Sequence, residues 1–417
     1  MIHVAVRDGY APATIAQVIA LAGVSRPTFY DYFSDKDDCF LAAVAAVQQK
    51  LLDRTRRAVE NVRPSRAAAA SVEVLIEFAA SEPVRAHFLT NEPLAGGPRA
   101  LDLRDRGIAE IARLVEEAQA RASGYVPDIA PRVLLGGLQR LLATRLRHGE
   151  HSMDGWLENL LAWVESYELP GDERRWSDLD ALVSAPPWPV PPEMLLRAPA
   201  PLTQPRSRPP EEVAENERQR IMFATAAVAE EVGYSASTIA QITKRAGVSH
   251  RSFAGLFADK QAAFMAIHEL GFQRTMAISA SAFFAGESWP ERIWEAGRAY
   301  AQFQHLNPPV AHIGLVDAYA VGPDAVQRVE DNLSGFTIFL QEGHRHTSQA
   351  TQRTSQIALE AIAACIFELC YLQIRHDRGR RFENMLPHNV FLCLAPFLGT
   401  AEANRFIDAQ LAATADA

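Results

Sequence analysis

A short segment around position 26 carries side chains that could bind double-stranded DNA. Phe29 and Phe33 lie four residues apart, the spacing of one face of a helix, so we expect both rings to pack into a core. Arginine is the commonest side chain to bind guanine O6 and N7 in the major groove, and hydroxyl groups commonly contact phosphates. The opposite face of this helix would point outward and could enter a groove, and it carries Arg26, Pro27, Thr28 and Tyr30.

The residues before this helix carry signals that start and end helices. Thr14 is followed three residues later by Gln17, a pair that forms a capping box at a helix N-terminus. Gly23 can adopt the left-handed conformation that ends such a helix, and Ser25 can cap the next one. Two helices joined by a short glycine turn form a helix-turn-helix, so the sequence predicts this motif near the start of the chain.

The same pattern occurs a second time. Residues 9–44 and 233–268 are identical at nearly half of their positions, and Arg147-His148 matches Arg375-His376 much further along each half. A similarity that extends this far indicates the duplication of whole modules of about 200 residues. The residues of the second copy that correspond to the candidate DNA contacts are Thr238, Ser249, His250, Arg251, Ser252 and Lys260.

Residues 22–36 read Ala-Gly-Val-Ser-x-x-Thr-Phe-Tyr-x-x-Phe-x-Asp-Lys, which resembles the signature of the TetR family of transcription regulators. The resemblance is strong over the DNA-binding segments only. It implies a three-helix bundle, a fourth helix leading into a ligand-binding and dimerisation domain, and release of DNA when an effector binds. It also implies phosphate contacts for Thr14, Tyr30 and Lys36, while Arg26 and Thr28 would contact bases.

The two copies depart from this signature in different ways. In the second copy Ala254 stands in place of the tyrosine, and Gly255 costs about 1 kcal/mol of helix propensity. We therefore expect the second copy to bind DNA more weakly. In the first copy Met1 aligns with Thr225, which leaves only about two turns of the first helix, whereas the second copy has a full helix over residues 216–232. Either the chain starts further upstream or the first bundle is weakened.

Proline content separates the two modules. Residues 171–213 are rich in proline, which favours an extended linker, whereas apolar residues elsewhere recur at intervals of three and four and predict an all-α fold. We expect a helix-turn-helix domain at residues 1–58, a helical ligand-binding and dimerisation domain at 59–170, the linker at 171–213, a second helix-turn-helix domain at 214–281 and a second helical domain at 282–417. Residues 1–170 are called module one below, and residues 214–417 module two.

The last two predicted helices of each module are candidates for a pairing surface. By the same resemblance, residues 129–149 and 155–168 form half of a four-helix interface, with residues 354–376 and 382–397 as their equivalents. Gly136 and Gly137 would let two helices approach closely there. The modules could pair within one chain as a pseudo-dimer or between chains as a homodimer. A pseudo-dimer would place two recognition helices near the roughly 34–36 Å spacing of successive major grooves.

Composition limits the other classes of function. The net charge of −9 gives no global basic signature, so a positive surface for DNA must be local. The four cysteines form no CxxC pair, and no signal peptide or membrane-spanning run is present, which predicts a cytoplasmic protein without disulfides. No catalytic or dinucleotide motif is present, so we expect neither an enzyme nor a cofactor. The loose cluster of Glu342, His344 and His346 is interpreted as a solvated helix end and not as a metal site.

Aromatic and histidine side chains of the helical domains are candidates for an effector pocket, although core packing is the commoner role for each. The sequence predicts a repressor that a small, largely apolar effector releases from its operator. The alternative is a ligand-binding or dimerising partner protein whose DNA-binding units are degenerate. The candidate pocket residues are Phe78, His87 and Phe88 in module one and Trp294, Phe303, His305 and His312 in module two.

Overall fold

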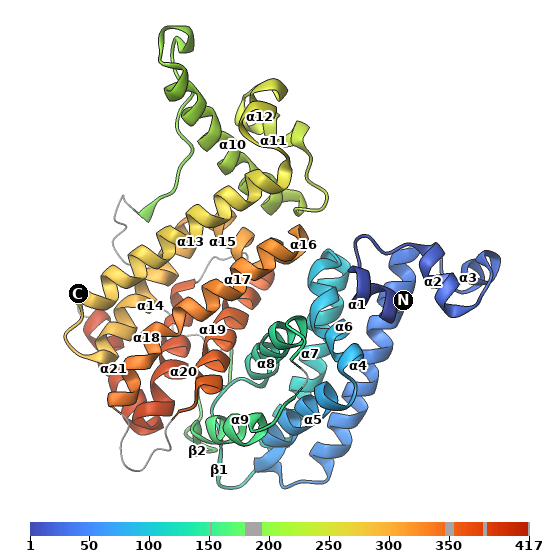
Figure 1. Cartoon of the computed structure of the whole chain (residues 1–417). Helices are drawn as coiled ribbons and strands as arrows, with labels where there is room; N and C mark the ends of the chain where they lie inside the picture. The colour runs from blue at the N-terminus through green and yellow to red at the C-terminus, as the bar shows by residue number, and fades with distance from the viewer. Residues whose placement is uncertain (151, 180–193, 347–353, 378–381, 416–417) are drawn as a thin grey trace. The chain divides into compact units, whose positions relative to one another are not determined.

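The computed structural model describes residues 1–150, 152–179, 194–346, 354–377 and 382–415 (Figure 1). Within these residues the regular structure is helical, apart from two three-residue strands, β1 (Tyr125–Pro127) and β2 (Glu168–Pro170). The strands pair antiparallel, with Val126 opposite Leu169. The all-α fold predicted from the sequence is confirmed.

Compact unit 1 comprises Met1–Leu182, Leu333–Leu369 and His388–Gln410. Its long helix α4 (Lys36–Glu60) packs against α5 (Ala67–Ser81) and α7 (Pro98–Gln119), while α6 (Pro83–Ala95) packs on α8 (Pro131–Arg147). Its other elements are α1 (Ile2–Asp8), α2 (Ile15–Ala22), α3 (Arg26–Tyr32), the 3-10 helix η1 (Pro64–Arg66), α9 (Trp156–Glu165), α18 (Ile338–Gln341), the 3-10 helix η5 (Glu342–Arg345) and parts of α19 (Gln356–Asp377), α20 (Leu386–Leu398) and α21 (Thr400–Ala415).

Compact unit 2 comprises Val183–Asn332, Cys370–Pro387 and Leu411–Ala417. Helix α10 (Pro210–Val232) packs against α11 (Ile239–Ala246) and α13 (Lys260–Ala285), and α13 packs along α14 (Trp289–Leu306). Its other elements are the 3-10 helix η3 (Pro205–Ser207), α12 (His250–Leu256), α15 (Pro308–His312), the π-helical turn η4 (Ile313–Asp317), α16 (Ala318–Val321), most of α17 (Pro323–Phe336) and the 3-10 helix η6 (Phe382–Met385).

The compact units divide the chain differently from the two sequence modules. Helices from the C-terminal part of module two belong to compact unit 1, together with module one. The cause is close helix packing, because Gly137 of α8 lies directly against Cys365 of α19. Buried leucines on α8 and buried alanines on α19 surround this contact. The sequence placed helices here correctly but could not assign them to one core.

Part of the predicted linker is packed. The backbone N–H groups of Arg175, Trp176 and Ser177 donate to the carboxylate of Asp128 at 3.1, 2.9 and 2.9 Å. The side chain of Trp176 is buried in compact unit 1. Residues 171–179 therefore belong to the first core, because burial of the indole and the three hydrogen bonds outweigh the polar character of the segment. Residues 180–193, which hold five of the prolines, lie outside the described residues. The helix α10 begins at Pro210, since proline is tolerated in the first helical turn.

Candidate nucleic-acid interface

Both helix-turn-helix motifs have the predicted caps. Thr14 and Gln17 form a complete capping box at the start of α2, and Gly23 ends this helix in the left-handed conformation with φ of 67°. Thr238 and Gln241 form the same box at the start of α11, where Gly247 has φ of 63°. The positive φ angles explain the glycines, because other residues rarely adopt this conformation. The local geometry predicted for both motifs is confirmed.

The first recognition helix, α3, is fixed by its cap and by one buried ring. The hydroxyl of Ser25 accepts the Thr28 N–H at 3.2 Å, and the two hydroxyl oxygens lie 2.8 Å apart. Phe29 packs into a cluster with Val4 and Val18. A rigid helix of two turns therefore presents a defined outer face.

The outer face of α3 combines a cation with an aromatic ring. Arg26, Pro27 and Tyr30 are exposed, and Thr28 is half-buried beneath them. The guanidinium of Arg26 lies 5.9 Å from the centre of the Tyr30 ring, within the range of a cation–π contact. In the second motif His250 and Arg251 are exposed at the start of α12, and Ser252 bonds the capping Ser249. Each motif thus presents an arginine from the first turn of its recognition helix.

The capping threonines are already engaged within the protein. The Thr14 hydroxyl accepts the Gln17 N–H at 3.3 Å and donates to the Gln17 side-chain oxygen at 2.8 Å. Thr238 makes the same two contacts with Gln241. A phosphate contact from either hydroxyl therefore requires its proton to turn from the glutamine toward the phosphate.

The two lysines at the start of α4 and α13 brace the turn that precedes each motif. Lys36 donates to the carbonyls of Tyr10 and Ala11 at 3.1 Å each, and its ammonium lies over the Tyr10 ring. Lys260 donates to the carbonyls of Tyr234, the counterpart of Tyr10, and of Ser237, the counterpart of Ala13, and burial lowers the pKa of Lys260. An ammonium has three donors, so one remains for a phosphate. Sequence reasoning had assigned these lysines to DNA alone and missed their bracing contacts.

A buried carboxylate ties each motif to its helical domain. Glu92 of α6 accepts the Tyr10 N–H at 2.8 Å, and Asp317 of η4 accepts the Tyr234 N–H at 3.0 Å. We call this duplicated contact the acid clasp. His87 lies 4.0 Å from Glu92, and His312 lies 2.8 Å from Asp317. The shared offset of 225 residues (317 − 92 and 312 − 87) marks these pairs as equivalents, so the two histidines are placed at the clasp.

The first acid clasp is expected to depend on pH. Burial raises the pKa of Glu92 from 4.5 to about 7, against the opposing effects of the Tyr10 N–H and Arg147. The folded protein therefore holds a proton that the unfolded chain has lost. The resulting stability is complete below pH 4.5 and is lost as the pH rises to about 7, a change of roughly 3 kcal/mol.

Denaturant unfolding at several pH values tests this dependence. The Glu92→Gln variant is expected to lack this part of the decrease in the free energy of unfolding between pH 4.5 and 7. Glu77→Gln, on an exposed position of α5, is the matched control and should follow the wild type. Identical pH profiles for wild type and Glu92→Gln would contradict the assignment.

The two motifs differ in how well their cores are covered. The helix α10 has 23 residues and packs on α11 and α12, where Ala246 and Phe257 are buried. The helix α1 has only seven residues, and the corresponding Ala22 is exposed and Phe33 half-buried. Leu21 is 59% exposed. Over the residues that the structure describes, apolar side chains of the first motif are thus more exposed than their counterparts in the second.

The local charge favours DNA binding by the second motif. Residues 9–36 contain two basic and two acidic side chains, whereas residues 233–260 contain four basic and one acidic. The extra cations are Lys244 and Arg245 on α11, and Arg245 pairs with Glu231. Phosphate attraction is the larger part of nonspecific DNA binding, so this difference opposes the loss of the tyrosine at Ala254.

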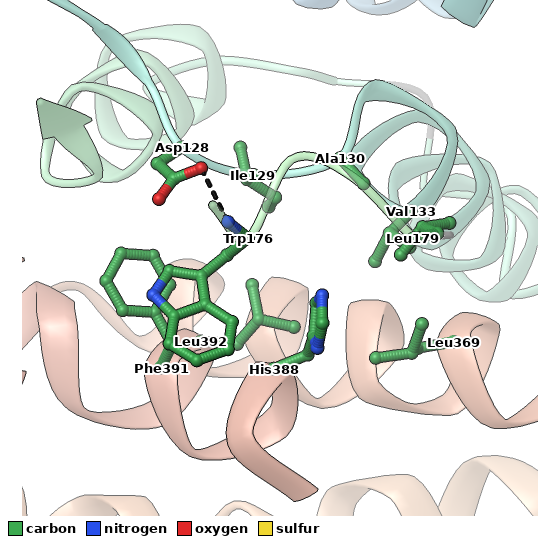
Figure 2. A pocket seen from close by; sticks show the side chains of 10 residues that line it. All are labelled: Asp128, Ile129, Ala130, Val133, Trp176, Leu179, Leu369, His388, Phe391 and Leu392. Carbon is green, nitrogen blue, oxygen red and sulfur yellow. Dashed lines mark hydrogen bonds between the residues drawn. The ribbon is translucent and has the colours of Figure 1, made fainter. Parts of the chain in front are cut away.

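The predicted effector residues do not gather at one site. Phe78, Phe88, Trp294 and Phe303 are buried in the cores of their domains, and His305 lies 3.5 Å from Glu383. A cavity of about 10 Å³ instead lies in compact unit 1, with room for about one water molecule (Figure 2). Figure 2 shows Trp176, Asp128 and His388 at its wall, and none of the seven predicted residues lines it. The sequence carried no sign of this cavity, because its walls come from four segments that are distant along the chain.

The described residues contain no cluster of three or more histidine, cysteine, aspartate or glutamate side chains that could hold a metal ion. Among the helices that the structure describes, α19 alone is long and apolar enough to cross a membrane, but 83% of its apolar window is buried within the protein. This helix is explained by its place in the core.

The described residues form two helix-turn-helix bundles, and each bundle continues through a long helix into an all-helical domain. This architecture defines the class of protein. Residues 2–43 and 221–267 both match the family model of bacterial regulatory proteins, tetR family. These two segments are similar to the DNA-binding region of tetR-family proteins, and together they indicate a DNA-binding transcription regulator with two helix-turn-helix motifs.

Comparisons with whole proteins add the following similarities. The chain is similar to the fatty acid degradation regulator FadR from Bacillus halodurans, with 16% identity and a TM-score of 0.39 over 42% of this chain and 94% of that one. It is also similar to a bacterial regulatory protein in the tetR family from Rhodococcus RHA1, with 21% identity and a TM-score of 0.36 over 43% of this chain and 96% of that one. A search of curated proteins found no match.

Proposed function

We propose that the protein is a repressor that leaves its operator when a small, largely apolar effector binds the helical domains. The acid clasp supports this proposal, because Glu92 and Asp317 join each helical domain directly to the backbone of a DNA-binding motif. An effector that displaces α6 or η4 would shift the hydrogen-bonded turn at Tyr10 or Tyr234 and so move the motif. The proposed function places the protein in the cytoplasm and includes no catalytic step.

The contacts with DNA are proposed residue by residue. Arg26 and Thr28 of α3 bind base edges, with His250, Arg251 and Ser252 of α12 as their counterparts. The remaining exposed or partly exposed polar groups bind phosphates. Pro27 and the capped helix starts shape the surface that faces the DNA. These phosphate contacts are assigned to Thr14, Ser25, Tyr30, Lys36, Thr238, Ser249 and Lys260.

Arginine substitutions test DNA recognition. Arg26→Ala and Arg251→Ala are each expected to weaken binding to the upstream region of the protein's own gene by about 5- to 150-fold, because a bidentate arginine–guanine contact is worth about 1–3 kcal/mol. Mobility shifts at several salt concentrations measure the effect. Arg113→Ala, which removes an exposed cation on α7, is the matched control. If both variants bind as tightly as this control, the arginines do not read the operator.

A partner protein that binds ligand or dimerises without binding DNA is the second candidate. Ala254 and Gly255 in the second motif and the exposed Leu21 in the first favour it. This candidate predicts equal binding of the upstream region and random DNA of the same length at every salt concentration. A clear preference for the upstream region would exclude it.

A further inference from the structure

A buried ion network joins the modules inside compact unit 1. Glu368 of α19 accepts two bonds from the guanidinium of Arg104 on α7, both at 3.0 Å, and one from Arg140 on α8 at 2.5 Å. Glu368 is fully buried, and both arginines are nearly so. Burial opposes ionisation of the Glu368 carboxyl, but the two arginines overcome it and lower its pKa to about 2. The network therefore consists of charges that depend on one another.

The central pair of this network lies at equivalent positions of the two modules. Arg147-His148 and Arg375-His376 are 228 residues apart, and so are Arg140 and Glu368 (368 − 140). The same offset relates Gly137 to Cys365, which also touch each other. In a symmetric dimer, a residue on the twofold axis meets its own copy. Arg140 and Glu368 thus occupy the place where two identical modules would put identical side chains.

The opposite charges of Arg140 and Glu368 favour the pairing of module one with module two only. Two copies of module one would bury Arg140 against Arg140, and two copies of module two would bury Glu368 against Glu368. A second ion pair opposes the pairing of two module-one copies, because Arg145 binds Glu360 at 2.6 Å, whereas the equivalent of Glu360 in module one is Arg132 (360 − 228). Buried like charges are strongly unfavourable, so both like pairings are penalised.

Side-chain size at the same contact gives a second, independent reason. A Cβ atom added to Gly137 would lie 2.5 Å from the sulfur of Cys365, and one added to Gly136 would lie 2.5 Å from the Glu368 side chain. Module two has Ala364 and Cys365 where module one has these glycines. Two copies of module two could not approach this closely, and two copies of module one would leave space beside their arginines.

We propose that α8 and α19 carry a pairing rule that admits only one module of each kind, so that the partner of this surface in module one is always module two. Every pair of modules joined through this surface then presents one DNA-binding motif of each type. Resting on the proposed function, this rule further implies an operator made of two unlike half-sites, since α3 and α12 present different side chains.

Charge exchange in the full chain tests the rule. Glu368→Arg gives the pair the charges of two module-one helices, and we expect Tm to fall by about 10 °C or more, with a similar loss for Arg140→Glu. The exchange variant R140E/E368R should regain about half of the loss, because Arg104 still faces an arginine in it. Purely additive losses would overturn the rule. If the single variants do not fold, Arg140→Gln, Glu368→Gln and their double variant give the same comparison with neutral side chains.

Cross-linking identifies which helices meet. Arg145→Cys/Glu360→Cys, treated with a short bismaleimide, is expected to link positions 145 and 360, while either single variant stays uncoupled because the four native cysteines are buried. A covalent dimer formed by one of the single variants would join two like helices and overturn the rule. Neither readout involves DNA, so failure of the proposed function would leave them unchanged. DNA sequences selected by binding to the wild-type protein should contain two unlike half-sites. A palindromic sequence would contradict the inference.

Discussion

The Phe253→Ala variant is expected to lose about 3–5 kcal/mol of stability in the second helix-turn-helix, and with it that motif's contribution to DNA binding. The Phe253 ring is 1% exposed and lies against Phe257 between the helices of the motif. Its removal leaves a cavity in the core of the motif, because the surrounding helices relax only partly around the lost ring. Denaturant unfolding measures the stability, and salt-titrated mobility shifts measure the binding.

The Phe29→Ala variant is the matched comparison in the first motif. Phe29 is also buried, but its neighbour Phe33 is only half-buried, so we expect a loss toward the lower end of the same range. The salt dependence of binding should decrease more in Phe253→Ala than in Phe29→Ala, because the second motif carries four basic residues against two. An unchanged salt dependence in Phe253→Ala would mean that the second motif does not contact DNA.

The Asp128→Ala variant is expected to destabilise compact unit 1 by roughly 3 kcal/mol or more. Asp128 is fully buried and accepts the N–H groups of Arg175, Trp176 and Ser177, so alanine would leave three donors without their acceptor. An unsatisfied buried donor costs about 1–3 kcal/mol. The indole of Trp176, stacked on Phe391, would lose its anchor at the same time.

Thermal unfolding and limited proteolysis test this expectation. Cleavage within residues 171–179 should appear in Asp128→Ala under conditions that leave the wild type intact. The Asp128→Asn variant keeps one acceptor oxygen and is expected to show a smaller effect. Equal protease resistance of all three proteins would show that the three hydrogen bonds do not hold this segment.

The helix-turn-helix units were predictable because their determinants are local. Capping boxes at Thr14 and Thr238, left-handed glycines at Gly23 and Gly247, and a ring at Phe29 lie within a few residues of what they position. No helix was expected between residues 80 and 99, where α6 lies, because its buried residues from Phe88 to Leu94 are continuous and show no helical period.

The contacts that join distant segments were not predictable. The acid clasp connects residues 82 positions apart in module one, and the bonds of Arg104 to Glu368 connect residues 264 positions apart. The effector pocket was predicted from aromatic and histidine residues, but single side chains of these types are more often core residues. Trp176, inside a segment that reads as linker, gave no periodic signal at all.

The sequence by itself determined an all-helical protein with two unequal DNA-binding motifs, because helix starts, turns and recognition faces depend on neighbouring residues. Only the tertiary structure decided which helices share a core, where the carboxylates of Glu92 and Asp317 bind, and that Arg140 meets Glu368. The physical reason is that burial and ion pairing depend on which surfaces meet in space. Spacing along one chain does not specify those meetings.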